Sequence, residues 1–415
     1  MGLRISIYNE PAGSGIGGSE FVAALLAEAL AGDHQVVLFH RVPSLTVEKL
    51  AANSGTRLDN VRLQYVDKPN SQPQVSPLNP RAHYRELQKI QAELSEGYDI
   101  FVAIVHDVPP FSHAKKGALI VLFPTPTAPY VKPEGGVDAK LALKRPGKYV
   151  YQSWAWKKRM EGYGLKTAIS EFSSLWTKRR WGIDCKIVYP PVNTSFNHVE
   201  KEKIILSVGR FALRGHGHRK NQEEMIETYA RMQSERPLDW KYFCVGGLAA
   251  TPAHEVYFEE LSTLAAKSGA ALATNQSHEE LKRLYERASI FWHASGYGED
   301  QNLQPTLVEH FGISTVEAMA AGCVPVVINK GGQPEIVEHE VSGFVWETLD
   351  QLKDYTTRLI SDDDLRLRMS AAARKRAQTF SREMFLKNFV GRLLGTAVGA
   401  QAQEPHLDRV STATR

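Results

Sequence analysis

The sequence predicts an α/β protein made of two doubly wound parallel sheets, and two observations support that fold class. Short apolar runs of strand length alternate with stretches of amphipathic helical pattern, which is typical of parallel βαβ units. The alternation stops near Pro190 and starts again near Ile204. With 415 residues, the chain is long enough for two or three domains of about 150 residues each.

The first half of the chain opens with an apolar run at residues 3–8 that we expect to be a buried strand. Amphipathic stretches at 20–31 and 82–94 indicate helices between the strands. Four prolines predict a long loop at 69–80, because proline breaks regular structure. The strands expected in this half cover residues 3–8, 35–39, 100–105, 118–123, 167–169 and 186–189.

The second half repeats the pattern after a Pro-Pro pair and a short polar stretch, which we interpret as a linker at 190–202. Its expected strands cover residues 204–208, 241–245, 270–273, 289–293 and 324–328. Sheets of this kind bind ligands at the carboxyl ends of their strands, so the binding site is expected between the two domains. The predicted boundaries are 1–195 and 200–380 for the domains, 381–396 for a last helix and 397–415 for a flexible polar tail.

The composition is that of an ordinary globular protein, with 43% hydrophobic and 23% charged residues. A net charge of +4 is too small to indicate nucleic-acid binding. Cys185, Cys244 and Cys323 lack metal-ligand spacing and suit a reducing compartment. The chain start lacks the apolar stretch of a signal peptide, and no apolar run approaches about 18 residues, so a cytoplasmic location is expected.

A glycine-rich loop at 13–18 follows the first expected strand. It fits Gly-x-Gly-x-x-Gly, in which glycines let backbone N–H groups approach a diphosphate at a helix N-terminus. A dinucleotide site also needs an acidic residue after the second strand, which here ends in Phe39-His40-Arg41. Arg41 could face a 2′-phosphate, so an NADP-dependent oxidoreductase and a plain tight turn remain alternatives.

Two basic side chains flank the first loop of the second domain. Arg210 follows the strand at 204–208, and Lys220 precedes the next helical pattern. A guanidinium fork together with an ammonium group suits a diphosphate. The alternative is a solvated basic loop, because Arg214, His216, His218 and Arg219 lie between them.

The segment from Glu309 to Gly322 combines two acids with the start of a helix. We expect Ser314 or Thr315 to cap the helix and leave N–H groups facing a phosphate. Glu317, one turn further on, could accept hydrogen bonds from ribose hydroxyls. Acids near a helix N-terminus also stabilise the helix whatever their function, which is the competing interpretation.

Taken together, these segments resemble the retaining glycosyltransferases of the GT-B fold, family 4, over residues 3 to 395. The most specific part is Glu309-x7-Glu317, set in Glu-His-Phe-Gly-Ile and Glu-Ala-Met-Ala-Ala-Gly. The other matching stretches are Gly331-Gly332-Gln333-Pro334-Glu335, Ser342-Gly343-Phe344, Ser207-Val208-Gly209-Arg210, Lys220-Asn221 and Gly17-Gly18-x-Glu20.

The resemblance implies a role for each matching position. Arg210 and Lys220 would stabilise the leaving nucleoside diphosphate, Glu317 would hold the ribose, and Glu309 the donor sugar. The first domain would take the acceptor, the second the nucleotide sugar, and the helix at 381–396 would cross back to the first domain. Further donor contacts would come from Gly17, Gly18, Gly312, Ile313 and Ser314.

The resemblance also implies a reaction without a bound cofactor or metal. The co-substrate would be a nucleotide-diphosphate sugar, with a GDP-sugar slightly favoured over a UDP-sugar, and the acceptor a glycan, a lipid-linked sugar or a small molecule. The histidine that many members carry near the end of a late first-domain strand is missing at 121–126, so His106 is the substitute candidate. His293 is expected to line the donor site, and an insertion at 295–307 could influence sugar or acceptor choice.

Residues 140–180 hold eleven basic against two acidic residues, with Tyr149, Tyr151, Trp154 and Trp156 among them. Such a patch could contact an anionic membrane or bind an anionic acceptor, whereas a solvated helix with inward-packed aromatics is the alternative. Nucleic acid is not expected, since bases and aromatics would have to follow one groove. A non-catalytic protein of the same fold that binds a partner through this patch is a further alternative.

Overall fold

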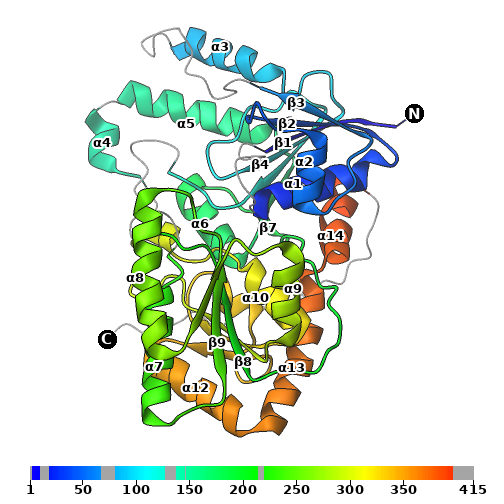
Figure 1. Ribbon diagram of the computed structural model, residues 1–415. Coiled ribbons are helices and arrows are strands. Elements are labelled where there is room, and N and C mark those ends of the chain that lie inside the picture. Colours follow the sequence, from blue (N-terminus) through cyan, green and yellow to red (C-terminus); the bar gives the residue numbers. More distant parts are fainter. Residues whose placement is uncertain are drawn as a thin grey trace.

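The computed structural model describes residues 2–9, 18–66, 80–126, 137–144, 146–213 and 219–395. Two α/β domains lie one above the other in Figure 1, each with its own parallel sheet. The two-domain α/β fold expected from the sequence is confirmed.

The first domain has a seven-stranded sheet in the order β3-β2-β1-β4-β5-β6-β7, with every pair parallel. Its strands are β1 (Arg4–Asn9), β2 (Gln35–His40), β3 (Val61–Tyr65), β4 (Ile100–Val105), β5 (Lys116–Val121), β6 (Leu165–Ala168) and β7 (Lys186–Ile187). Its helices are α1 (Gly18–Ala31), α2 (Val47–Ser54), α3 (Pro80–Ala92), α4 (Ala139–Lys144), α5 (Pro146–Glu161) and α6 (Glu171–Trp181).

The second domain has a six-stranded sheet in the order β10-β9-β8-β11-β12-β13, again parallel throughout. Its strands are β8 (Ile204–Val208), β9 (Lys241–Gly246), β10 (Ala271–Thr274), β11 (Ile290–His293), β12 (Val324–Ile328) and β13 (Phe344–Trp346). Its helices are α7 (Gln222–Glu235), α8 (Pro252–Ser268), α9 (His278–Arg287), η1 (Pro305–Leu307), α10 (Ile313–Ala321), α11 (Gln333–Ile336), α12 (Leu349–Ser361), α13 (Asp363–Ala377) and η2 (Gln378–Phe380).

Strand β4 shows why the central strands read as unbroken apolar runs. All six of its residues are buried, because helices cover both faces of the parallel sheet. Ile100, Val102 and Ile104 belong to the core on one face, together with α1. The alternate residues of the strand belong to the core on the other face.

The last helix, α14 (Arg382–Leu394), follows the second domain in sequence and packs on the first. Phe385, Phe389 and Leu393 are buried in the same core cluster as β1, β4 and α1. Figure 1 shows α14 beside α1. The chain passes between the domains twice, and the two passes pair at Val192 and Ser381.

Two strands were missing from the sequence prediction and several had shifted ends. Strand β3 is an edge strand in which only Val61 is buried, and β13 has only three residues. The strand expected at 186–189 ends at Ile187, and that expected at 118–123 runs from Lys116 to Val121. Most of the expected loop at 69–80 and the expected tail at 397–415 lie outside the described residues, whereas Pro80 itself begins α3.

Among the described residues, none of the helices combines the length and the apolar character that crossing a lipid bilayer requires.

Candidate active site at the carboxyl edge of the second sheet

Lys220 reaches Glu309 along a path that a neighbouring glycine keeps open. Gly209 follows β8, and a Cβ at this position would lie 2.6 Å from Cγ of Lys220. With no side chain there, the Lys220 stem passes over the loop, and its Nζ lies 2.5 Å from Oε2 of Glu309. Both side chains are about one-fifth exposed, at 18% and 20%, so the pair remains open to a ligand.

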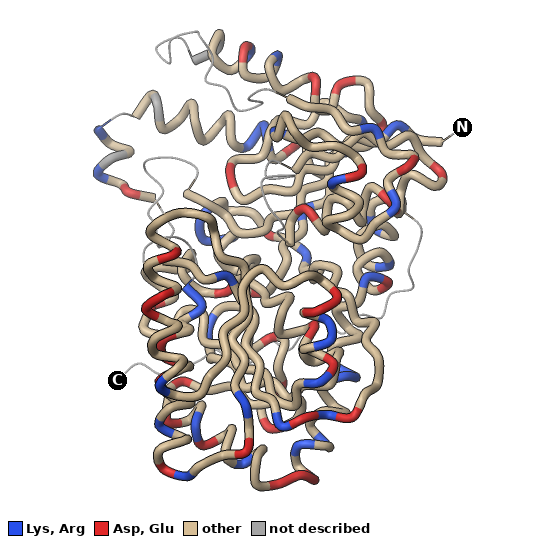
Figure 2. The backbone as a smooth tube through the Cα atoms, in the orientation of Figure 1, with Lys and Arg blue, Asp and Glu red and all other residues tan. Residues whose placement is uncertain are grey.

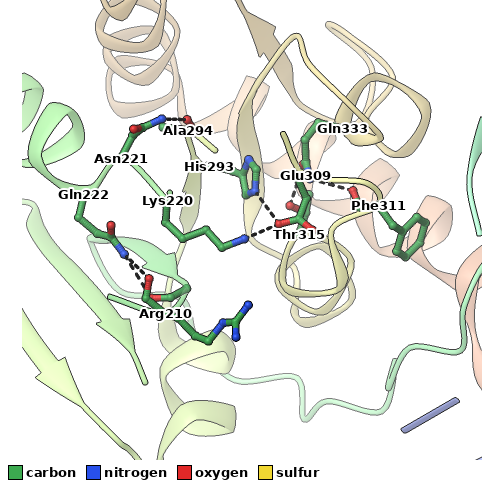
Figure 3. Close-up of polar contacts among 11 residues, drawn as sticks. Arg210, Lys220, Asn221, Gln222, His293, Ala294, Glu309, Phe311, Thr315 and Gln333 are labelled. Atoms are coloured by element: carbon green, nitrogen blue, oxygen red, sulfur yellow. Dashed lines mark hydrogen bonds and ion pairs between the residues drawn. The ribbon is translucent and has the colours of Figure 1, made fainter. Parts of the chain in front are cut away.

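His293 is the third member of this group, as Figure 3 shows. It ends strand β11 and is almost fully buried, with its Nε2 3.7 Å from Oε2 of Glu309. The structure thus brings Lys220, His293 and Glu309 together from three separate segments of the chain. A small pocket beside them is lined by Ser207, Val208, Gly209, Lys220, Gln222, Met225, Trp292, His293 and Ala294.

Arg210 is exposed, and its guanidinium extends toward the same space as the Lys220 ammonium group (Figure 3). The residues between them, 214–218, lie outside the described part of the chain. Two positive charges on one edge of the sheet form an arrangement that suits a diphosphate.

Asn221 and Gln222 anchor this loop by hydrogen bonds to neighbouring backbone carbonyls. Asn221 has left-handed backbone angles, with φ +53° and ψ +48°, and its Nδ2 donates to the carbonyl of Ala294 at 2.7 Å. The Nε2 of Gln222 donates to the carbonyl of Arg210 at 3.0 Å. Gln222 could not be predicted from its local sequence, because nothing in that pattern shows that this first-turn glutamine is buried.

Helix α10 begins differently from the sequence expectation, since neither Ser314 nor Thr315 caps it. The N-cap is Gly312, which has φ +128° and no side chain to offer. Thr315 instead donates through Oγ1 to Oε1 of Gln333 at 2.8 Å, and Nε2 of Gln333 donates to the carbonyl of Phe311 at 2.9 Å. A Cβ at Gly312 would lie 2.1 Å from Nε2 of Gln333.

A glycine cap leaves the helix start suited to an anion. The first N–H groups of an α-helix have no partner within the helix, and the helix dipole adds partial positive charge there. In α10 no side-chain cap covers them. This end of the helix directly follows Glu309 in the chain, so it adds positive potential to the same site.

Glu317 lies one turn into α10, and its environment shifts its titration. Burial raises the pKa of Glu317 to about 7, and the neighbouring Tyr285 hydroxyl opposes that rise. Near neutral pH, this carboxyl group therefore exchanges between an acceptor-only form and a form that can also donate a hydrogen bond.

The first domain contributes through the start of α1. A Cβ on Gly18 would lie 2.6 Å from Cδ1 of Ile313, so the starts of α1 and α10 meet across the domain boundary. Gly17 lies outside the described residues. His106 is exposed after β4, and its carbonyl accepts from the N–H of Thr125 at 3.0 Å.

The described residues contain no group of three or more His, Cys, Asp or Glu side chains arranged to hold a metal ion.

Solved structures with this architecture define its class. The chain aligns with Anabaena Alr3699/HepE in complex with UDP and glucose at a TM-score of 0.62 and 16% identity, covering 95% of this chain and 100% of the other. It aligns with WaaG, a glycosyltransferase involved in lipopolysaccharide biosynthesis, at a TM-score of 0.56 and 14% identity, covering 94% and 100%. The molecule therefore has the GT-B fold.

Sequence similarity is concentrated in the second domain. Residues 193–376, which include most of that domain, match the family described as glycosyl transferases group 1. The Dictyostelium discoideum GDP-Man:Man(3)GlcNAc(2)-PP-Dol alpha-1,2-mannosyltransferase is 29% identical over 51% of this chain and 43% of its own length. Human alpha-1,3/1,6-mannosyltransferase ALG2 is 26% identical over 51% and 53%. The chain thus spans about half the length of these curated relatives.

Proposed function

We propose that this chain is a glycosyltransferase that moves a sugar from a nucleotide-diphosphate sugar to an acceptor hydroxyl with retention of the anomeric configuration. The observation that carries the proposal is the meeting of Lys220, Glu309, His293 and the uncapped start of α10 at one edge of the second sheet. The group 1 family match of the same domain supports it.

The chemistry follows from where negative charge develops. The bond from the anomeric carbon to the diphosphate oxygen breaks, and the diphosphate leaves with the electron pair. Lys220, Arg210 and the N-terminus of α10 would stabilise that charge in place, without reorganising. The acceptor oxygen would form its bond on the face that the diphosphate leaves, and its proton would pass to the departing phosphate oxygen.

Glu309 and Glu317 would bind the rest of the donor. Glu309 precedes α10 and would hold the donor sugar, with His293 beside it. Glu317, one turn further, would accept hydrogen bonds from the ribose hydroxyls. Backbone groups at Gly312, Ile313 and Ser314 would bind the phosphate, with Gly17 and Gly18 facing it from the first domain. His106 stays a candidate for contacting the sugar from that domain.

The donor is proposed to be a GDP-sugar in preference to a UDP-sugar. Several of the curated relatives are named for GDP-mannose as their donor, which favours guanosine. The HepE structures hold UDP, but they share only the fold with this chain. A glycan or lipid-linked acceptor is proposed from the same relatives. The comparisons give no support to an NADP-dependent oxidoreductase or a non-catalytic binding protein.

A thermal-shift panel of GDP, UDP, ADP, NADPH, GDP-mannose and UDP-glucose tests this function. A ligand at 100 times its dissociation constant stabilises the protein by about 2.7 kcal/mol, which raises Tm by a few degrees. We expect GDP and GDP-mannose to raise Tm more than the others. A shift with NADPH alone would contradict the proposal.

Helices α4 and α5 are the proposed contact with an anionic membrane. Leu143, Val150 and Trp154 are 78%, 64% and 44% exposed, and Lys140, Lys144 and Lys157 are exposed near them. Figure 2 shows blue segments on α4, at the edge of the upper domain. Each basic residue near an anionic surface contributes about 1 kcal/mol.

The basic stretch is smaller than its sequence suggests. Arg159 and Arg180 are buried, where Arg159 stacks over Phe111 and Arg180 over Trp176. Trp154 contacts Tyr84, so the aromatic side chains of α5 face partly inward.

Vesicle co-sedimentation tests the membrane contact. The protein should pellet with phosphatidylglycerol vesicles and stay in the supernatant with phosphatidylcholine vesicles. Equal binding to both kinds of vesicle, or binding to neither, would contradict an electrostatic membrane contact.

A further inference from the structure

Three stacked rings cross the boundary between the domains next to Glu309. His310 of the second domain lies face to face with Phe123 of the first, with ring centroids 3.7 Å apart and planes 6° from parallel. Phe172 lies beside this pair, with its ring centroid 5.9 Å from that of Phe123 and 6.3 Å from that of His310, and its plane within 19° of both. His310 and Phe123 are both buried, at 8% and 2% exposed.

The backbone around His310 is fixed on the side of the second domain. Nε2 of His310 donates to the carbonyl of Pro305 at 3.2 Å. Pro305 lies near the end of the segment 295–307. The N–H of Gly332 donates to the carbonyl of Glu309 at 2.9 Å. A Cβ at Gly331 would lie 2.0 Å from that carbonyl oxygen, so the two chain segments are in close backbone contact.

The first-domain side of the stack is also held firmly. Arg180 lies over the Phe123 ring at 5.5 Å, and its Nη1 donates to the carbonyl of Pro124 at 2.7 Å. The backbone N–H groups of Glu171 and Phe172 donate to the carboxylate of Glu335, at 2.7 and 3.3 Å. Glu335 belongs to the second domain, so a polar contact between the domains reinforces the stack.

We propose that His310 is a positioning residue that fixes the location of the Glu309 carboxylate when the two domains are in contact. Residues 309 and 310 are consecutive, so a ring clamped against Phe123 limits how the Glu309 backbone can move. Glu309 is then held at the distance from Lys220 seen here. The inference rests on the proposed function, in which Glu309 holds the donor sugar and Lys220 the diphosphate.

This role predicts a split between two affinities. GDP contacts the lysine, the helix start and the ribose-binding acid, whereas GDP-mannose also contacts Glu309. Loss of the stack should therefore weaken binding of the sugar conjugate and leave the free diphosphate almost unaffected. A residue needed only for folding would weaken both ligands in parallel.

The experiment is calorimetric titration of GDP and GDP-mannose, or UDP and UDP-glucose if the Tm panel selects uridine, into the unaltered chain and four variants. His310→Ala removes the stack, and His310→Phe keeps a flat ring. Phe123→Leu removes the stack from the first-domain side. Tyr355→Leu is the matched control, because Tyr355 stacks on Phe344 at 4.5 Å and 8° within the second domain, away from Glu309.

We expect His310→Ala and Phe123→Leu each to lower the affinity for the sugar conjugate about fivefold to tenfold, the size of one aromatic pair. Affinity for the free diphosphate should change less than about twofold. His310→Phe keeps the ring and loses the hydrogen bond to Pro305, so its affinity for the sugar conjugate should fall less than that of His310→Ala. Tyr355→Leu should bind both ligands as the unaltered chain does.

Two results would overturn the inference while leaving the proposed function intact. One is an unchanged affinity for the sugar conjugate in His310→Ala, and the other is a parallel loss of both ligands in His310→Ala and Phe123→Leu. If the unaltered chain binds neither the diphosphates nor their conjugates, the proposed function itself fails, and this inference with it.

Discussion

Lys220 and Glu309 neutralise each other before any ligand binds. An ion pair with each side chain about one-fifth exposed gains little net stability, since desolvation offsets much of the attraction. The pair therefore contributes mainly by holding both groups in place. In the proposed reaction, a bound diphosphate would give Lys220 a second anionic partner and leave the Glu309 carboxylate available to sugar hydroxyls.

The two basic residues lead to the first prediction. Lys220→Ala and Arg210→Ala should each raise the activation free energy of donor turnover by about 2 to 4 kcal/mol, the loss typical of one preorganised donor. The measurement is the initial rate of nucleoside diphosphate release. Arg283→Ala, an exposed arginine on α9, is the control and should match the unaltered chain. Full activity in both site variants would contradict the proposal that Lys220 and Arg210 stabilise the leaving diphosphate.

Glu317 leads to a prediction with opposite effects on stability and binding. Its folded pKa of about 7 lies above the ordinary value of 4.5, so ionisation destabilises the folded state. That penalty is absent below about pH 4.5, grows as pH rises, and is complete above pH 7. Glu317→Gln should raise the free energy of unfolding by about 2 to 3 kcal/mol at pH 8, and by much less at pH 5.

The same variant should bind the donor more weakly at pH 8, because an amide replaces the carboxylate that is proposed to accept hydrogen bonds from the ribose. Urea denaturation and GDP titration at both pH values measure the two effects. A stability gain that is equal at pH 5 and pH 8 would show that burial does not shift this pKa. Unchanged GDP affinity would contradict the ribose role.

At the scale of elements, the start of α10 was the least predictable part of the site. The sequence places two hydroxyl residues near a helix start, a pattern that usually marks a cap. The actual start depends on Gln333, eighteen residues later, which holds both Thr315 and the carbonyl of Phe311. Local sequence contains no information about such a long-range partner, and the same reason explains why Gln222 was missed.

The elements that could be predicted were those whose burial shows in the sequence. Strand β4 is covered on both faces, so its apolar run is continuous, and its expected bounds agree with the structure. Strand β3 lies at the sheet edge with mixed burial, so nothing in its composition separates it from a loop. Lys220 and Glu309 were both expected to face the space at the ends of the strands, and their side chains do meet there. The ligand that they bind stays a prediction.

Gly312→Ala tests the helix start. The substitution places a side chain at φ +128° and 2.1 Å from Nε2 of Gln333, so we expect a loss of about 1 to 3 kcal/mol in unfolding free energy. The displaced helix start should also lower GDP affinity about tenfold. Urea denaturation and calorimetry measure the two quantities.

Gly269→Ala is the matched control for this variant. Gly269 has φ +76° at the end of α8, and a Cβ there meets no atom within 4 Å. It should cost some stability but leave GDP affinity unchanged. Equal GDP affinity in both glycine variants would show that the α10 start does not contact the nucleotide.

At the scale of the whole molecule, α14 links the two domains, because it follows the second domain in the chain but packs in the core of the first. Phe389 is fully buried among residues of β1, β4 and α1. The first domain therefore depends on residues that come after the second. Two α/β domains and a last helix were predictable from pattern, but the core that this helix joins was expected only from the family resemblance.

Phe389→Ala should cost about 3 to 5 kcal/mol of unfolding free energy, because it leaves a cavity in the first-domain core. Relative to the unaltered chain, the variant should show a larger increase in amide hydrogen exchange in β1 and β4 than in β8 and β11. Lys387→Ala, an exposed position on the same helix, is the control and should change neither. Faster exchange confined to the second domain would contradict this packing.

The position of α14 also has a consequence for the order in which the protein is made. A ribosome synthesises the chain from the N-terminus, so the strands at 4–9 and 100–105 emerge long before residues 385–393, which complete their core. The second domain lies between them and has all its own strands by residue 346. The second domain can therefore finish folding first, while the first domain still exposes the apolar surface that α14 later covers. Nascent chains stalled before α14 should therefore bind chaperones through their first domain.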